Sequence, residues 1–212
     1  MVIKKIMQHN LYNGLNEQEK NIINHIFLHL TNNYFIQQDP QFIDSKFKQN
    51  KAENITHRDT VRCIIINQNQ QICLLHSRAK DYYAIPGGGI EPNETLLQTL
   101  DREVYEETGY TIKNPIPLGK IYEERNNRLT NNYFFIAQAD KKSTPHFMDD
   151  EIEEDYELIW VNKIEAENLL QDKYNILKKN HFIPYNGSFV TTRHLKAIEY
   201  YIQRSQQPNQ IN

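Results

Sequence analysis

The sequence is poor in the residues that mark disulfide-rich secreted proteins and membrane spans. Its 212 residues include two cysteines, Cys63 and Cys73. Two cysteines supply neither a disulfide framework nor a metal site, and we expect both to be reduced and buried in strands. No apolar run approaches the roughly 20 residues of a transmembrane helix, and the early Lys4 and Lys5 precede no signal-peptide core. These absences predict a soluble, cytoplasmic protein.

Excess positive charge is absent as well. The 24 Lys and Arg residues are outnumbered by 27 Asp and Glu residues, which gives a net charge of -3 and a pI near 6.2. Binding to duplex nucleic acid relies on a basic surface, so that partner class is not expected. A nucleotide-sized ligand remains compatible with this charge. The length suits one domain with extensions or two small domains.

Glycine is scarce, with seven residues in the chain, but three of the seven follow Pro86 consecutively. Such a loop lets the backbone approach a ligand where a side chain would block it. Downstream, Thr95 and Gln98 form a capping box, so a helix should begin at Leu96. Gly109 suits the left-handed position after its end. The sequence predicts a glycine loop followed by a helix of about three turns.

The predicted helix has an apolar stripe beside an acidic one. The apolar stripe comprises Leu97, Leu100, Val104 and Thr108. The glutamates are Glu103, Glu106 and Glu107, at positions i, i+3 and i+4 on the adjacent arc. Like charges at this spacing cost a few tenths of a kcal/mol per pair. A divalent cation bound by these glutamates would offset the repulsion, and the stripe would then be a metal-binding site. The alternative is that the stripe is a solvated acidic face.

The segment from Gly88 to Tyr110 resembles the box that defines the Nudix hydrolase family. Its matching positions, in order, are Gly88, Glu94, Arg102, Glu103, Glu106, Glu107 and Gly109. Tyr110 is the one loose fit, since the family usually has an aliphatic residue there. The resemblance implies an α/β fold, an α/β/α sandwich with a mixed sheet. It also implies hydrolysis of a diphosphate bond in a nucleoside diphosphate linked to another group, with Mg²⁺ or Mn²⁺ bound.

The same resemblance assigns roles to the box residues. Glu103, Glu106 and Glu107 become metal ligands, with the Gly87 carbonyl as a further ligand, and hard oxygen donors suit a cation that binds phosphate. Arg102 and Glu94 are interpreted as supports that hold a glutamate in its metal-binding rotamer.

The general base has candidates in two places. Glu103 is the first choice within the box. Some family members instead use a glutamate on a distal loop, and here the acidic run at 149–155 offers Glu151 and Glu154. The alternative for that run is a solvated, mobile loop.

Substrate contacts are predicted just before the glycine loop. Arg78 and Lys80 could bind phosphate, and Tyr82 or Tyr83 could stack on a base. Surface charge and strand-end packing are the alternatives. Motifs that mark the ADP-ribose, dinucleoside polyphosphate, coenzyme A and NADH groups are missing, so a nucleoside triphosphate, an oxidised nucleotide and a nucleotide sugar all stay open. A second hypothesis is a catalytically silent domain that senses a nucleotide ligand or regulates a partner.

Three segments are expected along the chain. Residues 1–56 form a helical N-terminal extension whose apolar stripe packs on the catalytic domain or on a second subunit, as in a homodimer. Residues 57–172 form the Nudix domain, and residues 173–212 form a C-terminal helix and a frayed tail. The predicted strands are 59–67, 71–77, 117–125, 131–140 and 156–162, and a further helix is predicted over 163–171.

Overall fold

The computed structural model describes residues 34–37, 56–125, 128–145, 155–180 and 185–206. Most of the predicted helical extension over residues 1–56 lies outside them, as do the acidic residues 149–154.

Seven strands and three helices make up the described residues. The strands are β1 (Tyr34–Gln37), β2 (Thr56–Ile66), β3 (Ile72–Ser77), β4 (Tyr82–Ala84), β5 (Tyr110–Arg125), β6 (Arg128–Lys142) and β7 (Tyr156–Val161). The helices are α3 (Leu96–Thr108), α5 (Lys163–Lys179) and α6 (Tyr185–Gln206). All five predicted strands are present. β1 and β4 were not predicted, and β5 begins directly after Gly109 rather than at residue 117.

The strands form one mixed sheet with the order β1-β5-β6-β2-β3-β4, in which β7 also pairs with β3. β2 runs parallel to β6, and β1 runs parallel to β5, whereas the other pairs are antiparallel. β2 and β3, two of the predicted strands, form an antiparallel hairpin with Ile66 opposite Ile72. Its turn is closed by the Asn67 side chain, which accepts the backbone N–H groups of Asn69 and Gln71.

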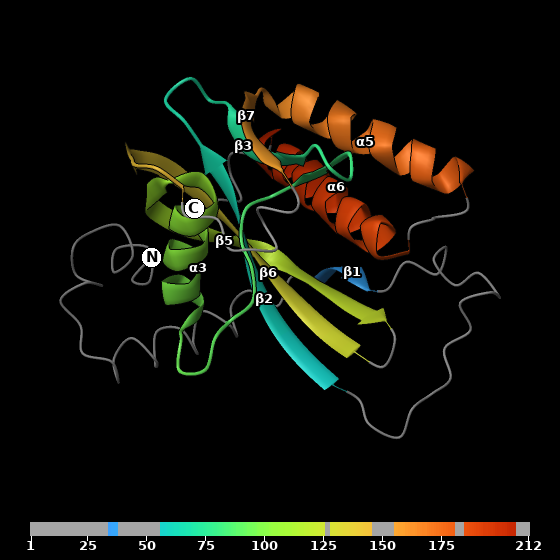
Figure 1. The fold of residues 1–212 in the computed structure, drawn as a ribbon, viewed down its shortest axis with the longest axis horizontal. Coiled ribbons are helices and arrows are strands. Elements are labelled where there is room, and N and C mark those ends of the chain that lie inside the picture. Colours follow the sequence, from blue (N-terminus) through green and yellow to red (C-terminus); the bar gives the residue numbers. More distant parts are fainter. Residues whose placement is uncertain (1–33, 38–55, 126–127, 146–154, 181–184, 207–212) are drawn as a thin grey trace.

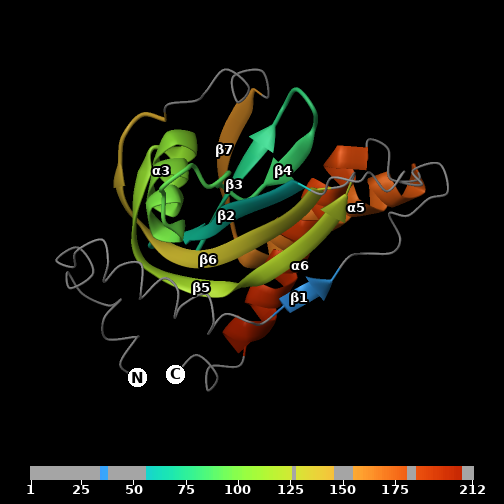
Figure 2. The same ribbon diagram turned by 90° about the horizontal axis from the view of Figure 1, so that it is seen from below.

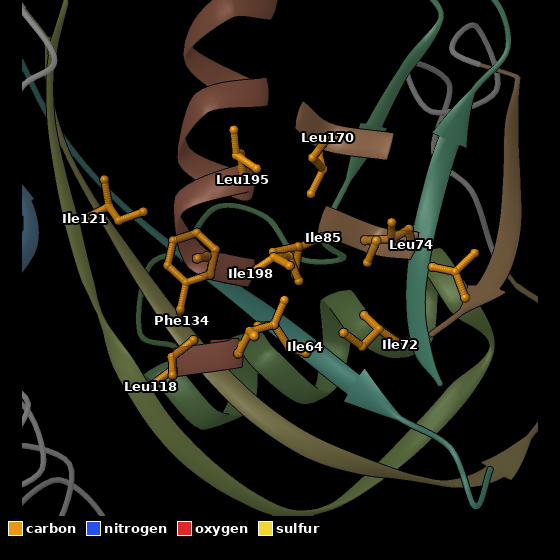
Figure 3. Packing of buried hydrophobic residues seen from close by; sticks show 14 residues of the cluster. Ile64, Ile72, Leu74, Ile85, Leu118, Ile121, Phe134, Leu170, Leu195 and Ile198 are labelled. Carbon is orange, nitrogen blue, oxygen red and sulfur yellow. The ribbon is translucent and has the colours of Figure 1, made fainter. Parts of the chain in front are cut away.

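Helices cover both faces of the sheet, as Figures 1 and 2 show. Because side chains alternate along a strand, β2 contributes to two cores. Val61, Cys63 and Ile65 pack with α3 on one face. Ile64 packs with α5 and α6 on the other, where Figure 3 shows Leu195 and Ile198 of α6 above the sheet. The predicted α/β/α sandwich with a mixed sheet is confirmed.

Two of the expected element limits need correction. The helix predicted over 163–171 continues to Lys179, so the predicted boundary after residue 172 falls inside α5. Within the segment predicted to be helical, residues 34–37 form strand β1 instead, because they pair with β5 at Lys120 to Tyr122. Among the described residues, no helix is long and apolar enough to cross a membrane.

Candidate active site

Helix α3 is fixed at both ends by local interactions. The Thr95 side chain accepts the backbone N–H of Gln98 at 3.3 Å, and the Gln98 side chain accepts the backbone N–H of Thr95 at 2.9 Å. Gly109 ends the helix with φ 71° and donates its N–H to the Tyr105 carbonyl at 2.8 Å. The predicted start, end and capping box are therefore confirmed. These caps set which way each glutamate of the helix points.

The glycine loop runs beside β2 at hydrogen-bonding distance. Val61 donates its N–H to the Gly88 carbonyl at 2.9 Å, and Cys63 donates to the Pro86 carbonyl at 2.9 Å. A Cβ on Gly87, whose φ is +133°, would lie 2.2 Å from the Val61 carbonyl oxygen. A Cβ on Gly88 would lie 2.3 Å from Oε2 of Glu103. Gly87 and Gly88 thus lie against β2 and Glu103, with no room for side chains.

Two of the three box glutamates are buried under this loop. Oε2 of Glu107 accepts the Gly87 N–H at 2.6 Å, so the carboxylate and the loop backbone are directly joined. Burial raises the pKa of Glu103, while the guanidinium of Arg102 acts to lower it. Glu106 lies at the margin, with 29% of its side chain exposed. The acidic stripe is therefore not a solvated face.

Arg102 connects these carboxylates. Its Nη1 donates to Oε1 of Glu103 at 2.9 Å and to Oε2 of Glu106 at 3.0 Å. Nε and Nη2 form a two-pronged pair with Glu94 at 2.7 and 2.9 Å, and Nη2 also reaches the Gly89 carbonyl at 3.1 Å. The Arg102 hydrogen bond, aided by Thr99, lowers the pKa of Glu94 to about 2. One arginine thus orients two box glutamates and ties α3 to the glycine loop.

The carboxylate oxygens of the box glutamates suit a hard cation, although they do not all point toward one position. Among the described residues, Oε2 of Glu103 and Oε1 of Glu106 accept no hydrogen bond. In that same part of the chain, no three His, Cys, Asp or Glu side chains are grouped as a metal site. The Arg102 guanidinium lies between the carboxylates of Glu103 and Glu106, whereas the Glu107 carboxylate accepts the Gly87 N–H. Carboxylate oxygens are the ligands that Mg²⁺ prefers, so the chemistry of these side chains suits such an ion.

The predicted substrate contacts have other partners in the structure. Arg78 forms a two-pronged pair with Asp155 at 2.6 and 3.0 Å and is half exposed. The Tyr83 ring stacks on His76 with 4.6 Å between centroids. The Tyr82 hydroxyl lies 2.7 Å from that of Tyr156. Lys80 lies in the β3–β4 turn, where its backbone N–H bonds Ser77 Oγ at 3.2 Å.

A buried polar network on the α6 side of the sheet was missed by the sequence analysis. Nη1 of Arg193 pairs with Glu123 at 2.8 and 3.1 Å, and both side chains are less than 10% exposed. Asn132 donates to Glu123 at 2.8 Å and accepts the Thr60 hydroxyl at 2.9 Å. The members of this network come from β2, β5, β6 and α6. No short-range pattern links positions 70 residues apart.

Two further residues near the glycine loop were also missed. Nδ1 of His194 accepts the Ile85 N–H at 3.2 Å, so α6 fixes the chain just before Pro86. Burial keeps the pKa of His194 well below its usual value, so the ring is neutral. Arg62 lies on β2, where Gly87 approaches its Cα. In the sequence, the one indication of a role for Arg62 is that it places a charge inside the otherwise apolar run from Val61 to Ile66.

Comparison with known proteins places this site in context. A family model described as NUDIX domain matches residues 56–180. A human diphosphoinositol polyphosphate phosphohydrolase is 34% identical over 97 residues, which cover 43% of this chain and 53% of that protein. A provisionally named 8-oxo-dGTP diphosphatase of Bacillus subtilis is 31% identical over 72 residues, which cover 34% and 48%. The chain thus spans about half the length of these curated relatives.

A solved structure supports the fold itself. The structure described as an ADP compounds hydrolase aligns with a TM-score of 0.53 at 16% identity, over 73% of this chain and 76% of that one. At that identity the match concerns the arrangement of strands and helices.

Proposed function

The chain belongs to the NUDIX domain family, and from that premise we propose that it is a pyrophosphohydrolase, which uses water to cleave a diphosphate bond. The observation that carries the proposal is the complete set of box carboxylates around the glycine loop. Glu103 and Glu107 are buried there, and Arg102 holds Glu103 and Glu106. Three glutamates placed this close together cost repulsion and burial energy, which a bound cation would offset.

Glu103, Glu106 and Glu107 would hold a divalent cation, Mg²⁺ or Mn²⁺, with the Gly87 carbonyl as a further ligand. When bound, such an ion neutralises phosphoryl oxygens and orients the attacking water. Arg102 holds one carboxylate oxygen of Glu103 and one of Glu106, and Glu94 in turn fixes Arg102.

Glu103 is the proposed general base within the box. Its buried carboxylate has a raised pKa, and a base accepts a proton more readily as its pKa approaches the working pH. Glu151 and Glu154 remain the alternatives on the distal loop.

The proposed substrates share a diphosphate group. The chemistry implied by the box covers nucleoside triphosphates, oxidised nucleotides and nucleotide sugars, and the human relative's name adds diphosphoinositol polyphosphates to the compounds worth testing. The chemistry at phosphorus is the same in all of them, because each presents oxygen-rich anions to a hard cation.

A panel of these compounds with Mg²⁺ tests the proposal by phosphate release. We expect turnover by the unaltered protein and a loss on the order of a hundredfold or more in Glu106→Gln and in Glu107→Gln, since each removes a charged ligand. Asp101→Asn is the matched control, because Asp101 is an exposed acid on the same helix. Tight binding of a panel compound without any turnover would instead support a ligand-sensing domain.

A further inference from the structure

Arg62 lies on β2, and its charge has no ion-pair partner among the described residues. Its Nε is buried and makes no hydrogen bond, although the residue as a whole is half-buried. An arginine cannot lose its proton in a protein, so it cannot escape the cost of burial by becoming neutral. A buried donor such as this Nε normally has a hydrogen-bond partner, and one without a partner needs an explanation.

The neighbouring charges are already paired with other groups. Arg193 and Glu123 neutralise each other at 2.8 Å, and Arg102 holds Glu103 at 2.9 Å. Burial and then Arg193 lower the pKa of Arg62, while Glu107 and Glu103 raise it, which places the guanidinium within the field of both clusters. An anion that approached it would therefore meet a positive charge that is not otherwise engaged.

The position of Arg62 joins that charge to the candidate active site. Val61 and Cys63, its neighbours on β2, donate their backbone N–H groups to the glycine loop. A Cβ on Gly87 would lie 2.9 Å from the Arg62 Cα, and the same residue donates its N–H to Glu107. The arginine and the carboxylates therefore flank one stretch of backbone.

We propose that Arg62 is a phosphate-binding residue, whose guanidinium contacts oxyanions of the substrate's diphosphate beside the glycine loop. The planar guanidinium can donate two parallel hydrogen bonds to a pair of phosphate oxygens. The ligand, rather than another residue of the protein, would then neutralise its charge. The identity of the phosphate carrier rests on the proposed function, but the anion site itself does not.

The competing role is that of a counter-ion for Glu103 and Glu107. A counter-ion stabilises the ligand-free protein, so Arg62→Gln would lower its melting temperature. If the charge instead awaits a ligand, Arg62→Gln leaves the ligand-free melting temperature unchanged or raises it, because no pair is lost.

The direct test uses inorganic pyrophosphate with EDTA present, measured by titration calorimetry. We expect Arg62→Gln to bind about tenfold or more weakly than the unaltered protein, since a charge-assisted contact is removed. Arg62→Lys keeps the charge without the fork and should fall between the two. The control is Arg128→Gln, which removes an exposed arginine at the far end of neighbouring β6. Equal affinities in the unaltered protein and Arg62→Gln, or no binding by either, would overturn the assignment.

Kinetics separate this inference from the proposed function. For any compound that the protein hydrolyses, Arg62→Gln should raise KM by about tenfold with a smaller change in kcat, as expected for lost ground-state binding. Unchanged KM and kcat would refute the role of Arg62 and leave the hydrolase intact. Arg62-dependent binding of pyrophosphate without hydrolysis of any compound would retain the anion site and refute the hydrolase.

Discussion

Three consecutive glycines have different neighbours, so each tolerates a methyl group differently. The Gly87 Cβ would meet the Val61 backbone, which cannot move without displacing β2. The Gly88 Cβ would meet the Glu103 carboxylate, and the Gly89 Cβ would meet the tip of the Arg58 side chain. A clash with the backbone disturbs the fold, whereas a clash with a side chain disturbs the function of that side chain.

Gly88→Ala should therefore impair activity more than stability. The new Cβ, 2.3 Å from Oε2, forces the Glu103 carboxylate to move. A displacement of about 1 Å at a catalytic group can lower kcat by about a hundredfold. Gly89→Ala is the control, because Nη2 of Arg58 at 3.0 Å can swing away. The expected result is a large fall in phosphate release for Gly88→Ala only, with little change in either melting temperature. Equal activities would show that the position of Glu103 is not critical.

Glu94 gives a prediction about acid stability. Pairing with Arg102 lowers the pKa of Glu94 from its ordinary value of 4.5 to about 2. A carboxylate with a lowered pKa in the folded state stabilises the protein above the unfolded value and loses that contribution as the pH falls toward the folded value. Urea unfolding should show Glu94→Gln less stable than the unaltered protein at pH 6, with the difference shrinking between pH 4.5 and about 2. A difference that stays constant over this range would refute the pairing. Glu91→Gln, an exposed neighbour, should show no such trend.

At the scale of elements, α6 is attached to the sheet by charge as well as by apolar contacts. Arg193 of α6 pairs with Glu123 of β5, and His194 accepts the Ile85 N–H. Both contacts are buried, so water cannot replace them easily. The helix thereby positions the strand and the loop that border the carboxylates.

Breaking this ion pair should be costly because one charge stays buried. Arg193→Met leaves Glu123 without its partner, and such a loss typically destabilises a protein by about 3–5 kcal/mol. The double variant Arg193→Met with Glu123→Gln removes both charges and should recover most of the stability. Urea unfolding of the two variants measures the difference. If the double variant were as unstable as the single one, the cost would come from lost packing rather than from the buried charge.

At the scale of the molecule, α6 belongs to the catalytic domain's core although the family match ends at residue 180. Leu195, Ile198 and Ile202 are buried in the same cluster as Ile64 and Phe134 (Figure 3). Fully burying each such side chain stabilises a fold by about 1.5–3 kcal/mol, which is a large share of a domain's total.

A chain that ends at Asn180 should accordingly fail to fold cooperatively. Its sheet would keep α5 but expose the apolar surface that α6 covers, so we expect a broad unfolding transition and binding of a hydrophobic dye. A chain that ends at Gln206 keeps all of α6 and is the control, which should unfold like the 212-residue chain. A sharp transition at an unchanged temperature in the shorter chain would contradict the assignment of α6 to the core.

The sequence predicted most reliably the features that depend on neighbouring residues. The limits of α3 follow from Thr95, Gln98 and Gly109, each within a few positions of the helix end it forms. The β2–β3 hairpin follows from two apolar runs around a short polar turn. Strand β4 was missed because three residues carry too short a pattern, and β1 because its pairing with β5 is decided over 80 residues away.

The sequence by itself determined the family, the helix that carries Glu103, Glu106 and Glu107, and the chemistry those carboxylates suit. Periodicity and capping are local properties, so they can be followed along a linear chain. Only the tertiary structure decided which charges have partners. It joined Glu123 to Arg193, and it left Arg62 unpaired among the described residues. Charge pairing depends on which distant strands and helices pack together, and the order of residues does not record that.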